Sequence, residues 1–514
     1  MTARGFRAPV TASREQTTVF RSTHRLPFLD YYRVPYEVIG EQWGPGHFDL
    51  PALGRLRDVS CEPDGGRTLL WFRAEERGQP GAACVLGRYR LGSSWLFGHV
   101  VPDATAVEWL SRAGTGWRPV QPLESEDGAH VASVWRDADG SVFLPFDMGE
   151  VMENFWSERY REVGRSRAAA VGRSAVLRGY YLLKPAIPRR MQLVLRRGFT
   201  RVQEQSSFPR WPVEDSLHDL YAWLLSLLAE VRGGPVPWLD MWPHGRSWAL
   251  VLTHDVETDV GYRNMHLLRD AERAAGFRSS WNFVPERYDV EESVLQGLRD
   301  DGCEIGVHGL RHDGHDLGSR RLLRRRLPAI RRSAERWGAV GFRSPATQRA
   351  WELMPELGFD YDSSYTDTDP YEPQPGGCCT YLPYFNEQQV ELPITLPQDH
   401  TLFTILRHTD GDLWVDKARH LRDRGGMALV LVHPDYASDS YLAGAWSRLL
   451  EEFRDDDTAW QALPREVADW WRRRASSTIR ETGSGWDIEG PAADDGTVRF
   501  AVPGSPLPAS GVAS

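Results

Sequence analysis

The sequence predicts an α/β protein, with a parallel sheet or barrel in its second half. From Ser247 onward, short apolar runs alternate with amphipathic helical stretches, beginning with WALVLTHD and ending with GMALVLVHPDY. Strands that alternate with helices at this interval are typical of parallel sheets and barrels. Just before them, GGPVPWLDMWPHG has the glycine and proline content of a loop and marks a domain boundary.

The size and charge of the chain limit the classes of function. A chain of 514 residues is longer than a domain with a single hydrophobic core usually is, so two or three domains are expected. Its 41% hydrophobic and 26% charged residues are those of an ordinary globular protein. A formal net charge of −10 argues against nucleic acid or an anionic membrane as the partner.

The cysteines and the amino terminus indicate a reducing compartment. The 5 cysteines are scattered without a CxxC pair, which predicts free thiols and no disulfide framework. The adjacent Cys378 and Cys379 are interpreted as buried or loop thiols, in preference to a redox or metal pair. The first residues lack the apolar core of a secretory signal, and no stretch has the roughly 18 to 20 apolar residues of a membrane span. The expected location is the cytoplasm.

Residues 1–240 are expected to form an N-terminal α/β or α+β domain of unknown role that ends in a helical connector. The first 20 or so residues are polar, which favours disorder. Short apolar runs follow, and a DADG turn separates two of them. Helical periodicity is present at Thr105–Ala113, at Met148–Tyr160 and in DSLHDLYAWLLSLLAEV.

Residues 241–476 are expected to form the domain of alternating strands and helices. Helices are predicted near Met265–Ala275 and Glu291–Asp301, and a long basic helix is predicted in GSRRLLRRRLPAIRR. Because its leucines recur at helical spacing in an acidic chain, we interpret that stretch as a solvated helix face and not as a nucleic-acid patch. Residues 477–514 are rich in Ser, Gly, Pro and Asp, which predicts a disordered tail.

Titratable residues follow five of the predicted strands in the second half. They are His254, Asp255 and Glu257 after the first, His308 and His312 after the second, Arg343 after the third, Asp362 after the fourth and His433 after the fifth. Taken singly, each has an ordinary explanation as a helix cap or loop residue. Together they supply the residue types of one hydrolytic site, and carboxyl ends of parallel strands are where such sites form.

These residue types suit amide hydrolysis. Neutral imidazoles and a carboxylate form an open site for Zn²⁺ or a similar divalent ion. A second carboxylate can act as general base and a histidine on the opposite side as general acid. An arginine beside the base would hold it ionised, and a carboxylate on the acid histidine would favour the imidazolium.

The motifs resemble those of the NodB-type polysaccharide deacetylases, which are carbohydrate esterase family 4. The resemblance covers about Trp248 to Trp471 and consists of five motifs in the family's order: THDVE, HGLRH, RSP, YDSS and LVLVHPD. It implies a distorted (β/α) barrel. In the first half, VFLPFD and ENFWSERY resemble the N-terminal region of large deacetylase-like proteins.

The resemblance also implies a role for each motif residue. It implies that Asp255 is the catalytic base and that Arg343 holds this base in place. It implies that His433 is the general acid and that Asp362 is its partner. It further implies that His308 and His312 are metal ligands.

Two positions depart from the family pattern. The family has a second aspartate after the base, where this chain has Val256, so Glu257 is the candidate third metal ligand by analogy with relatives that have a D-x-D arrangement. The family has Ser or Thr where this chain has Gly309. The expected cofactor is a divalent metal, with Zn²⁺ as the first choice, and a metal-free variant stays open.

Further residues near the motifs are candidates for substrate contact. They are His254, Trp281 and Pro345, with Trp351 as a second tryptophan to examine. For His254 a structural role is the ordinary alternative, and most of the 21 tryptophans are expected in the core.

The predicted function is hydrolysis of a non-peptide carbon–nitrogen bond, namely metal-dependent N-deacetylation of an N-acetylated sugar or glycan intermediate. Two alternatives stay open: a non-catalytic glycan-binding or complex-organising protein, and a metal-independent hydrolase of small cyclic amides. The predicted partner is an N-acetylated carbohydrate or related amide. The sequence determines neither the sugar, the acyl group nor the oligomeric state.

Overall fold

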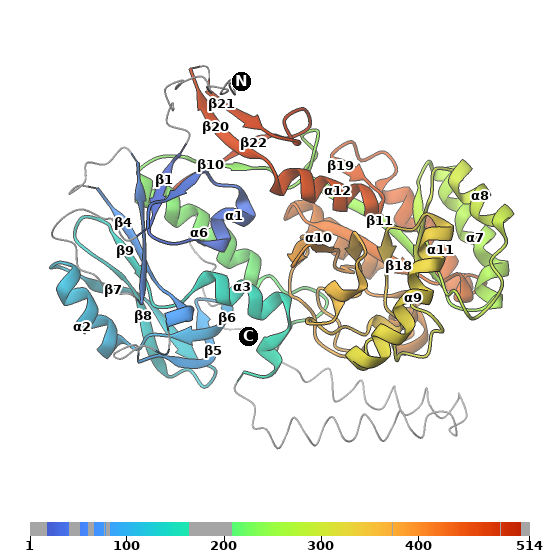
Figure 1. Cartoon of the computed structure of the whole chain (residues 1–514), viewed down its shortest axis with the longest axis horizontal. Coiled ribbons are helices and arrows are strands. Elements are labelled where there is room, and N and C mark those ends of the chain that lie inside the picture. Colours follow the sequence, from blue (N-terminus) through green and yellow to red (C-terminus); the bar gives the residue numbers. More distant parts are fainter. Residues whose placement is uncertain are drawn as a thin grey trace, which may run out of the picture.

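The chain folds into two nine-stranded sheets within its described residues, one from each half of the sequence (Figure 1). The computed structural model describes residues 18–40, 52–59, 66–76, 78, 83–163, 208–372, 374–483 and 485–504. The predicted disorder of the first 20 or so residues falls mainly outside this range. So does most of the helical connector before residue 208.

The first sheet is mixed, in the order β2-β1-β3-β4-β9-β8-β7-β5-β6. Its strands are β1 Phe20–Ser22, β2 Tyr36–Val38, β3 Leu53–Asp58, β4 Thr68–Phe72, β5 Val85–Leu91, β6 Ser94–Val100, β7 Arg118–Ser125, β8 His130–Arg136 and β9 Val142–Leu144. The helices and helical turns of this half are α1 Pro27–Tyr32, η1 Ala74–Glu76, α2 Asp103–Ala113, α3 Met148–Trp156, η2 Arg159–Arg161 and α6 Ser216–Arg232.

The helices predicted in the first half are confirmed. The periodic stretches correspond to α2 and α3, and the apolar stretch DSLHDLYAWLLSLLAEV corresponds to α6. The DADG turn joins β8 to β9, which pair antiparallel. Asp147 ends this strand region and begins α3, because its side chain accepts hydrogen bonds from the amides of Gly149 and Glu150.

The second sheet is mainly parallel and carries the predicted motifs. Its strands are β11 Trp248–Val256, β12 Ser279–Phe283, β13 Glu304–Val307, β14 Gly341–Phe342, β15 Tyr361–Asp362, β16 Tyr384–Asn386, β17 Gln389–Glu391, β18 Met427–Val432 and β19 Ala459–Gln461. Neighbouring strands are parallel in the order β17-β15-β14-β13-β12-β11-β18, while β16 pairs antiparallel with β17 and β19 lies beside β11. All residues of β11 and β18 are buried, as expected for strands covered on both faces.

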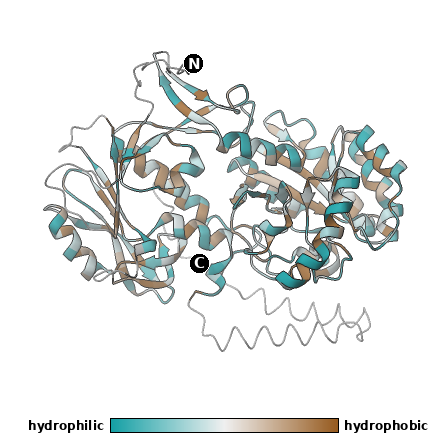
Figure 2. Cartoon of the chain, viewed as in Figure 1, coloured by the Kyte–Doolittle hydropathy of each residue, from teal (hydrophilic) through white to brown (hydrophobic). Residues whose placement is uncertain are grey.

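Helices and helical turns connect these strands. They are α7 Asp259–Ala275, α8 Glu292–Asp300, α9 Arg320–Trp337, η4 Pro345–Thr347, η5 Met354–Leu357, η6 His400–Leu406, α10 Asp412–Asp423, η7 Pro434–Tyr436, α11 Ser440–Phe453 and α12 Pro464–Ala475. Figure 2 shows apolar residues in the central strands and hydrophilic residues on the outer sides of the helices. The predicted alternation of strands and helices is therefore confirmed.

The second sheet curls, so that its two ends approach each other. Beyond β17, the amide of Ile394 donates to the carbonyl of Tyr365 at 2.8 Å, and the amide of Leu396 donates to the carbonyl of Leu429 in β18 at 3.0 Å. This short segment therefore lies between the β15 side of the sheet and β18. The result is a curled α/β sheet that resembles an incomplete barrel.

One hydrophobic core extends through both halves of the chain. The Tyr31 hydroxyl donates to the carbonyl of Pro383 at 3.0 Å, and the Tyr160 hydroxyl donates to that of Gly377 at 2.8 Å. The buried guanidinium of Arg474 donates to the carbonyls of Tyr31 and Leu239. The two sheets are thus distinct but tightly joined, and a domain boundary near residue 240 stays a prediction.

The prediction of disorder after residue 476 is wrong for most of this segment. Residues form β20 Thr478–Thr482, β21 Gly485–Glu489 and β22 Val498–Ala501. Strands β20 and β21 pair with each other, and β22 pairs antiparallel with β10 Val236–Leu239. Composition alone suggested disorder, but Ile479 and Ala492 are buried against the core. Residues 505–514 lie outside the described part.

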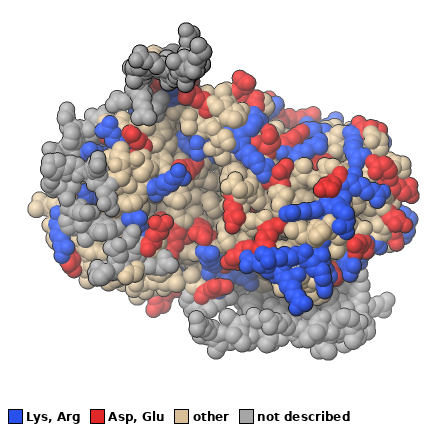
Figure 3. All heavy atoms as spheres, viewed as in Figure 1, with Lys and Arg blue, Asp and Glu red and all other residues tan. Residues whose placement is uncertain are grey.

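The basic stretch predicted as a solvated helix is α9. Its Leu323, Ile330 and Trp337 are buried, and its arginines contact carboxylates, including Arg326 with Asp313 at 2.6 Å. Figure 3 shows basic and acidic side chains interspersed on the face in view.

The four described cysteines, Cys84, Cys303, Cys378 and Cys379, are free thiols, as predicted. Cys61 lies outside the described residues. No helix in the described part of the chain is long and apolar enough to cross a membrane.

Candidate active site

The predicted site residues of the second half gather at the carboxyl ends of its parallel strands. Asp255 is the second-to-last residue of β11, and His308, Arg343 and His433 directly follow β13, β14 and β18. Because adjacent parallel strands end at the same edge of a sheet, residues far apart in sequence come into contact here.

Asp255 is buried, with 1% of its surface exposed, and is held by two hydrogen bonds to one oxygen. Its Oδ1 accepts from Asn282 Nδ2 at 2.8 Å and from Arg343 Nη1 at 3.2 Å. Burial favours the neutral acid, but His308 and Arg343 together hold the pKa of the Asp255 carboxyl below its ordinary value. Asp255 is therefore a fixed carboxylate whose other oxygen, Oδ2, lies 3.6 Å from His308 Nδ1.

Arg343 is held in place from several sides. Its Nη1 also donates to Thr253 Oγ1 at 2.9 Å, while Nε and Nη2 donate to the carbonyl and hydroxyl oxygens of Ser363 at 2.7 and 2.8 Å. Since Thr253 lies two residues before Asp255 on β11, their side chains point to the same face of the sheet. The predicted contact between Arg343 and the carboxylate is present.

His308 presents one ring nitrogen to the site. Its Nδ1 lies 3.1 Å from the carbonyl oxygen of Arg343, which favours the tautomer with the proton on Nδ1. Its Nε2 is buried and has no hydrogen-bond partner among the described residues. Burial lowers the pKa of His308 to about 4, so the ring is neutral at neutral pH.

Glu257 and His312 lie beside this nitrogen. His312 Nε2 is 2.8 Å from Glu257 Oε1, and the backbone of His312 has a left-handed φ of 55°. The amide of Glu257 donates to Asp435 Oδ2 at 3.0 Å, and the Thr258 hydroxyl donates to the other oxygen of Asp435. Burial opposes ionisation of Glu257, but the contact with His312 and the nearby histidines hold its pKa below the ordinary value.

These three side chains have the features of a divalent cation site. One ligand atom from each of Glu257, His308 and His312 lies within 4.8 Å of the others. Two imidazoles and one carboxylate are the donor set of an open catalytic zinc site. The unpartnered, buried Nε2 of His308 also fits, because such an atom is otherwise rare in a protein interior.

His433 has a different partner from the one predicted. Its Nδ1 lies 2.6 Å from Asp399 Oδ1, and its amide donates to Asp399 Oδ2 at 2.8 Å. Burial alone would lower the pKa of His433, but the Asp399 carboxylate raises it to about 10, which favours the imidazolium at neutral pH. The other nitrogen, Nε2, is 3.7 Å from Glu257 Oε1 and so faces the candidate metal ligands.

The prediction that Asp362 pairs with His433 is therefore wrong. Asp362 is on β15 and pairs in register with Glu391 on β17. Both carboxyls are buried and accept hydrogen bonds from the Ser364 amide, at 2.8 Å for Asp362 and 3.1 Å for Glu391. Because two buried carboxylates this close repel each other, burial and this proximity raise the pKa of the pair.

Sequence reasoning missed three polar residues of the site: Asn282, Asp399 and Asp435. Asp399 follows the apolar stretch ELPITLP, so it satisfies the same strand-end criterion that identified the other residues. Asn282 lies inside β12. To predict its role, one would need to know which residue of the neighbouring strand lies beside Asp255. Asp435 belongs to the HPD sequence already noted around His433.

The predicted substrate contacts of His254 and Trp281 are wrong. These two side chains are fully buried and pack against each other on the opposite face of the sheet from Asp255, with ring centroids 4.2 Å apart. His254 Nε2 lies 2.7 Å from Glu272 in α7. Alternation along a strand explains the result, since His254 and Asp255 are consecutive. Trp351 packs against Tyr365 and Tyr384.

Gly309 is required by the local backbone, and it explains the departure from the family pattern. Its φ is +64°, and a Cβ at this position would come within 2.6 Å of Asp316 Oδ2 and of the Pro345 ring. Pro345 is buried beside the loop that carries His308. A serine or threonine therefore does not fit at residue 309 without displacement of this loop.

No protein-family model and no curated protein matches the sequence. Solved structures similar to the chain include polysaccharide deacetylases and family 4 carbohydrate esterases. A protein assigned to the polysaccharide deacetylases from Mycobacterium smegmatis is 19% identical, with a TM-score of 0.37, over 45% of this chain and 92% of that one. The Puue allantoinase is 18% identical, with a TM-score of 0.38, over the same shares of 45% and 92%.

The peptidoglycan deacetylase PdaC from Bacillus subtilis is 12% identical, with a TM-score of 0.31, over 45% of this chain and 94% of that one. With identities and TM-scores this low, the assignment of function depends on the geometry of the site itself.

Proposed function

We propose that the protein is a hydrolase that removes the acyl group from an N-acetylated sugar or glycan intermediate. The observation that carries this proposal is the placement of a buried carboxylate and a buried imidazolium on two sides of one ligand cluster. Asp255 is the carboxylate, His433 is the imidazolium, and the cluster is Glu257, His308 and His312.

In the proposed reaction Asp255 is the general base. Its Oδ1 is occupied by Asn282 and Arg343, so Oδ2 accepts the proton of the attacking water. Because Arg343 keeps the carboxylate ionised and oriented, the base is ready before substrate binds. Attack on the acyl carbon gives a tetrahedral species, and the carbon–nitrogen bond then breaks.

His433 is the proposed general acid. Asp399 holds its Nδ1 and keeps the ring protonated, so Nε2 donates a proton to the departing nitrogen. The products are the free carboxylic acid and the amine. This assignment replaces Asp362 with Asp399 as the partner of the acid.

Glu257, His308 and His312 are the residues that would hold a divalent cation. When bound there, a cation such as Zn²⁺ supplies Lewis-acid polarisation of the reacting carbonyl. The Asp435 carboxylate fixes the backbone of Glu257, and the Arg343 carbonyl fixes the ring of His308, so both side chains are oriented by neighbours.

Release of acetate from N-acetylated oligosaccharides tests the proposal. The wild-type chain should release acetate, and Asp255→Asn should lose at least about 10³-fold in kcat, because it removes the general base but keeps the shape. Asp270→Asn, on the exposed side of α7, is the matched control and should keep full activity.

Chelation separates the proposal from its alternatives. Loss of activity with chelator and recovery with Zn²⁺ supports the metal-dependent reaction, whereas unchanged hydrolysis of small cyclic amides in chelator supports a metal-independent enzyme. Sugar binding with no turnover of any substrate supports a non-catalytic protein. The cytoplasmic location also stays a prediction, which cell fractionation can test.

A further inference from the structure

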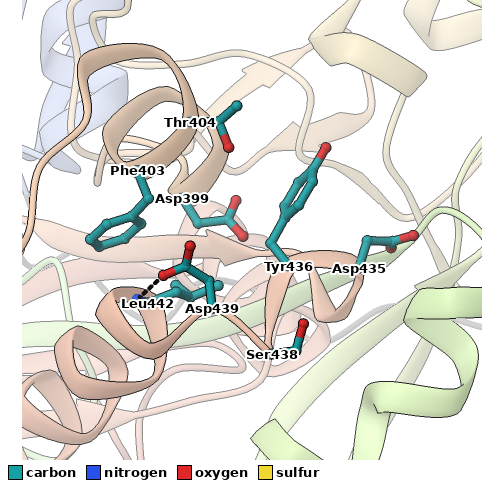
Figure 4. A pocket seen from close by; sticks show the side chains of 8 residues that line it. All are labelled: Asp399, Phe403, Thr404, Asp435, Tyr436, Ser438, Asp439 and Leu442. Carbon is teal, nitrogen blue, oxygen red and sulfur yellow. Dashed lines mark hydrogen bonds between the residues drawn. The ribbon is translucent and has the colours of Figure 1, made fainter. Parts of the chain in front are cut away.

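The cavity beside Asp399 adjoins the proposed acid, and its walls come from η6, η7 and the start of α11 (Figure 4). It therefore belongs to the site described above. The outer side of α9 has a feature that the proposed reaction does not use. In Figure 3 basic side chains gather along this helix, at the lower edge of the second half.

The arginines of α9 fall into two sets. The first set contacts neighbouring segments, and its members are Arg320, Arg324, Arg326 and Arg331. Their partners are the carboxylates of Asp313, Asp316 and Glu356 and the carbonyl of Leu357. The second set is exposed and has no hydrogen-bond or ion-pair partner among the described residues. Its members, which we call the arginine row, are Arg321, Arg325, Arg332 and Arg336.

The arginine row lies on one face of the helix. Its members follow one another at intervals of 4, 7 and 4 residues, and such intervals return to the same face because the α-helix has 3.6 residues per turn. The row extends from Arg321 to Arg336, 15 residues on, which is about 22 Å of helix. Leu323 and Trp337 are buried on the opposite side, where Trp337 packs against Phe283 of β12. Only the charged side of α9 therefore faces solvent.

Few acidic groups offset the charge of the arginine row. Glu335 is the one acidic residue of α9. Asp313, Asp316 and Glu356 pack against the helix but are already paired with the first set of arginines. The net charge of −10 refers to the whole chain, so it does not exclude a local surface of the opposite sign. The outer side of α9 is thus a straight band of positive charge.

We propose that the arginine row docks the protein on a membrane surface that carries anionic lipid headgroups. Because α9 lies on the outer side of the second half, a flat surface can meet the row along its full length (Figure 1). Each arginine close to an anionic membrane surface strengthens binding about fivefold, so four together contribute about 10³-fold. This inference does not depend on the reaction proposed above.

Other anionic partners fit this surface less well. A protein interface has apolar or aromatic residues at its centre, and none of the exposed large apolar side chains of the described part is on α9. Single-stranded nucleic acid stacks on exposed aromatic rings, whereas Trp337, the one aromatic residue of α9, is buried. Insertion among the lipid tails also needs exposed apolar side chains. Docking through the arginine row is therefore electrostatic and reversible by salt.

Co-sedimentation of the full chain with lipid vesicles tests the proposal. Vesicles of phosphatidylcholine with about one third phosphatidylglycerol should bind the protein, and vesicles of phosphatidylcholine alone should not. Salt at about 1 M should release the protein, because the screening length falls from about 10 Å at 0.1 M to about 3 Å. The double variant Arg321→Gln/Arg325→Gln should weaken binding about 30-fold. Addition of Arg332→Gln and Arg336→Gln should abolish it.

Arg320→Gln/Arg324→Gln is the matched control. It removes two positive charges from the same turns of the helix, but these guanidiniums are turned toward Glu356 and away from the arginine row. Its effect on vesicle binding should be much smaller. Equal losses in the two double variants, or a lack of preference for anionic over neutral vesicles, would overturn the proposal. Binding to double-stranded DNA without binding to anionic vesicles would also overturn it and would make the row a nucleic-acid surface.

Discussion

Glu158 and Arg349 form a buried ion pair that joins the two halves of the chain. Glu158 Oε1 lies 2.5 Å from Arg349 Nη2, and the two side chains are only 4% and 1% exposed. Arg349 also donates to the carbonyls of Thr347 and Gln374, each at 3.0 Å. The loop before it contains Ala346 and Thr347 with left-handed φ values of 55° and 48°. The N-terminal half thus anchors the loop that directly follows Arg343.

We expect Glu158→Gln to reduce both stability and turnover. Loss of one partner of a buried ion pair leaves an uncompensated charge and costs about 3 to 5 kcal/mol. A strained loop that loses its anchor should also loosen Arg343 and lower kcat. Thermal unfolding and acetate release measure the two effects. Glu153→Gln, which affects the exposed pair with Arg159, is the control and should change neither. A wild-type kcat in folded Glu158→Gln would contradict the link to Arg343.

We expect Asp399→Asn to move the alkaline limit of activity to lower pH. Without this carboxylate the pKa of His433 should fall from about 10 toward its ordinary value of 6.5, so the acid form is lost at lower pH. The pH profile of kcat measures the shift. Asp362→Asn should leave this limit in place, because Asp362 contacts Glu391 and Ser364 and not His433. A shift in the Asp362 variant alone would reverse the assignment.

The same raised pKa predicts a pH dependence of stability. The folded pKa of His433 lies above the value of the unfolded chain, so the folded state binds its proton more tightly. This contribution is fully present below about pH 6.5 and is lost as the pH rises through about 10. Melting temperatures should therefore fall more steeply over this range in the wild type than in Asp399→Asn. Parallel curves for the two proteins would contradict it.

We expect Gly309→Ser to destabilise the loop of the candidate metal ligands His308 and His312, although it introduces the residue type of the family that the motifs resemble. A left-handed φ and the contact with Pro345 each oppose a side chain, at a cost of about 1 to 3 kcal/mol. Bound zinc after dialysis and the melting temperature measure the effect, and both should fall. Gly338→Ser, which also has a positive φ but open space around its Cβ position, is the control for φ alone.

We expect His254→Gln to change stability without a change in KM. His254 is buried between β11 and α7, where it contacts Glu272, so its loss affects packing and leaves a buried carboxylate with one partner fewer. Any folded fraction should bind substrate normally, because the side chain points away from Asp255. An increased KM in well-folded protein would restore the predicted substrate contact.

The sequence predicted the strand ends better than the directions of side chains. Apolar runs followed by titratable residues identified Asp255, His308, Arg343 and His433, because a strand-to-loop transition is visible in one chain. The roles of His254 and Asp362 were predicted wrongly. The face of the sheet on which a side chain lies, and the residue that it contacts, depend on which strands are neighbours, and the packing of the whole sheet determines this. Asp399 also follows an apolar stretch but was missed, because the short η6 that begins after it has no recognisable helical pattern in the sequence. Among the C-terminal strands, β22 was missed because its partner is the distant β10, whereas β20 and β21 pair with each other in a stretch whose composition suggested disorder.

The pairing of β22 with β10 has a consequence for any attempt to shorten this protein. A chain ended at residue 476 would leave the backbone groups of β10 along an open edge, which other molecules can extend into intermolecular sheets. A chain begun at residue 241 would also remove the Tyr31 and Leu239 carbonyls that satisfy the buried guanidinium of Arg474. A fragment of residues 241–476 lacks both β10 and β22 and leaves the Arg474 guanidinium without these partners, so it should be unstable, and a lack of activity in it would say nothing about the chemistry of the intact chain.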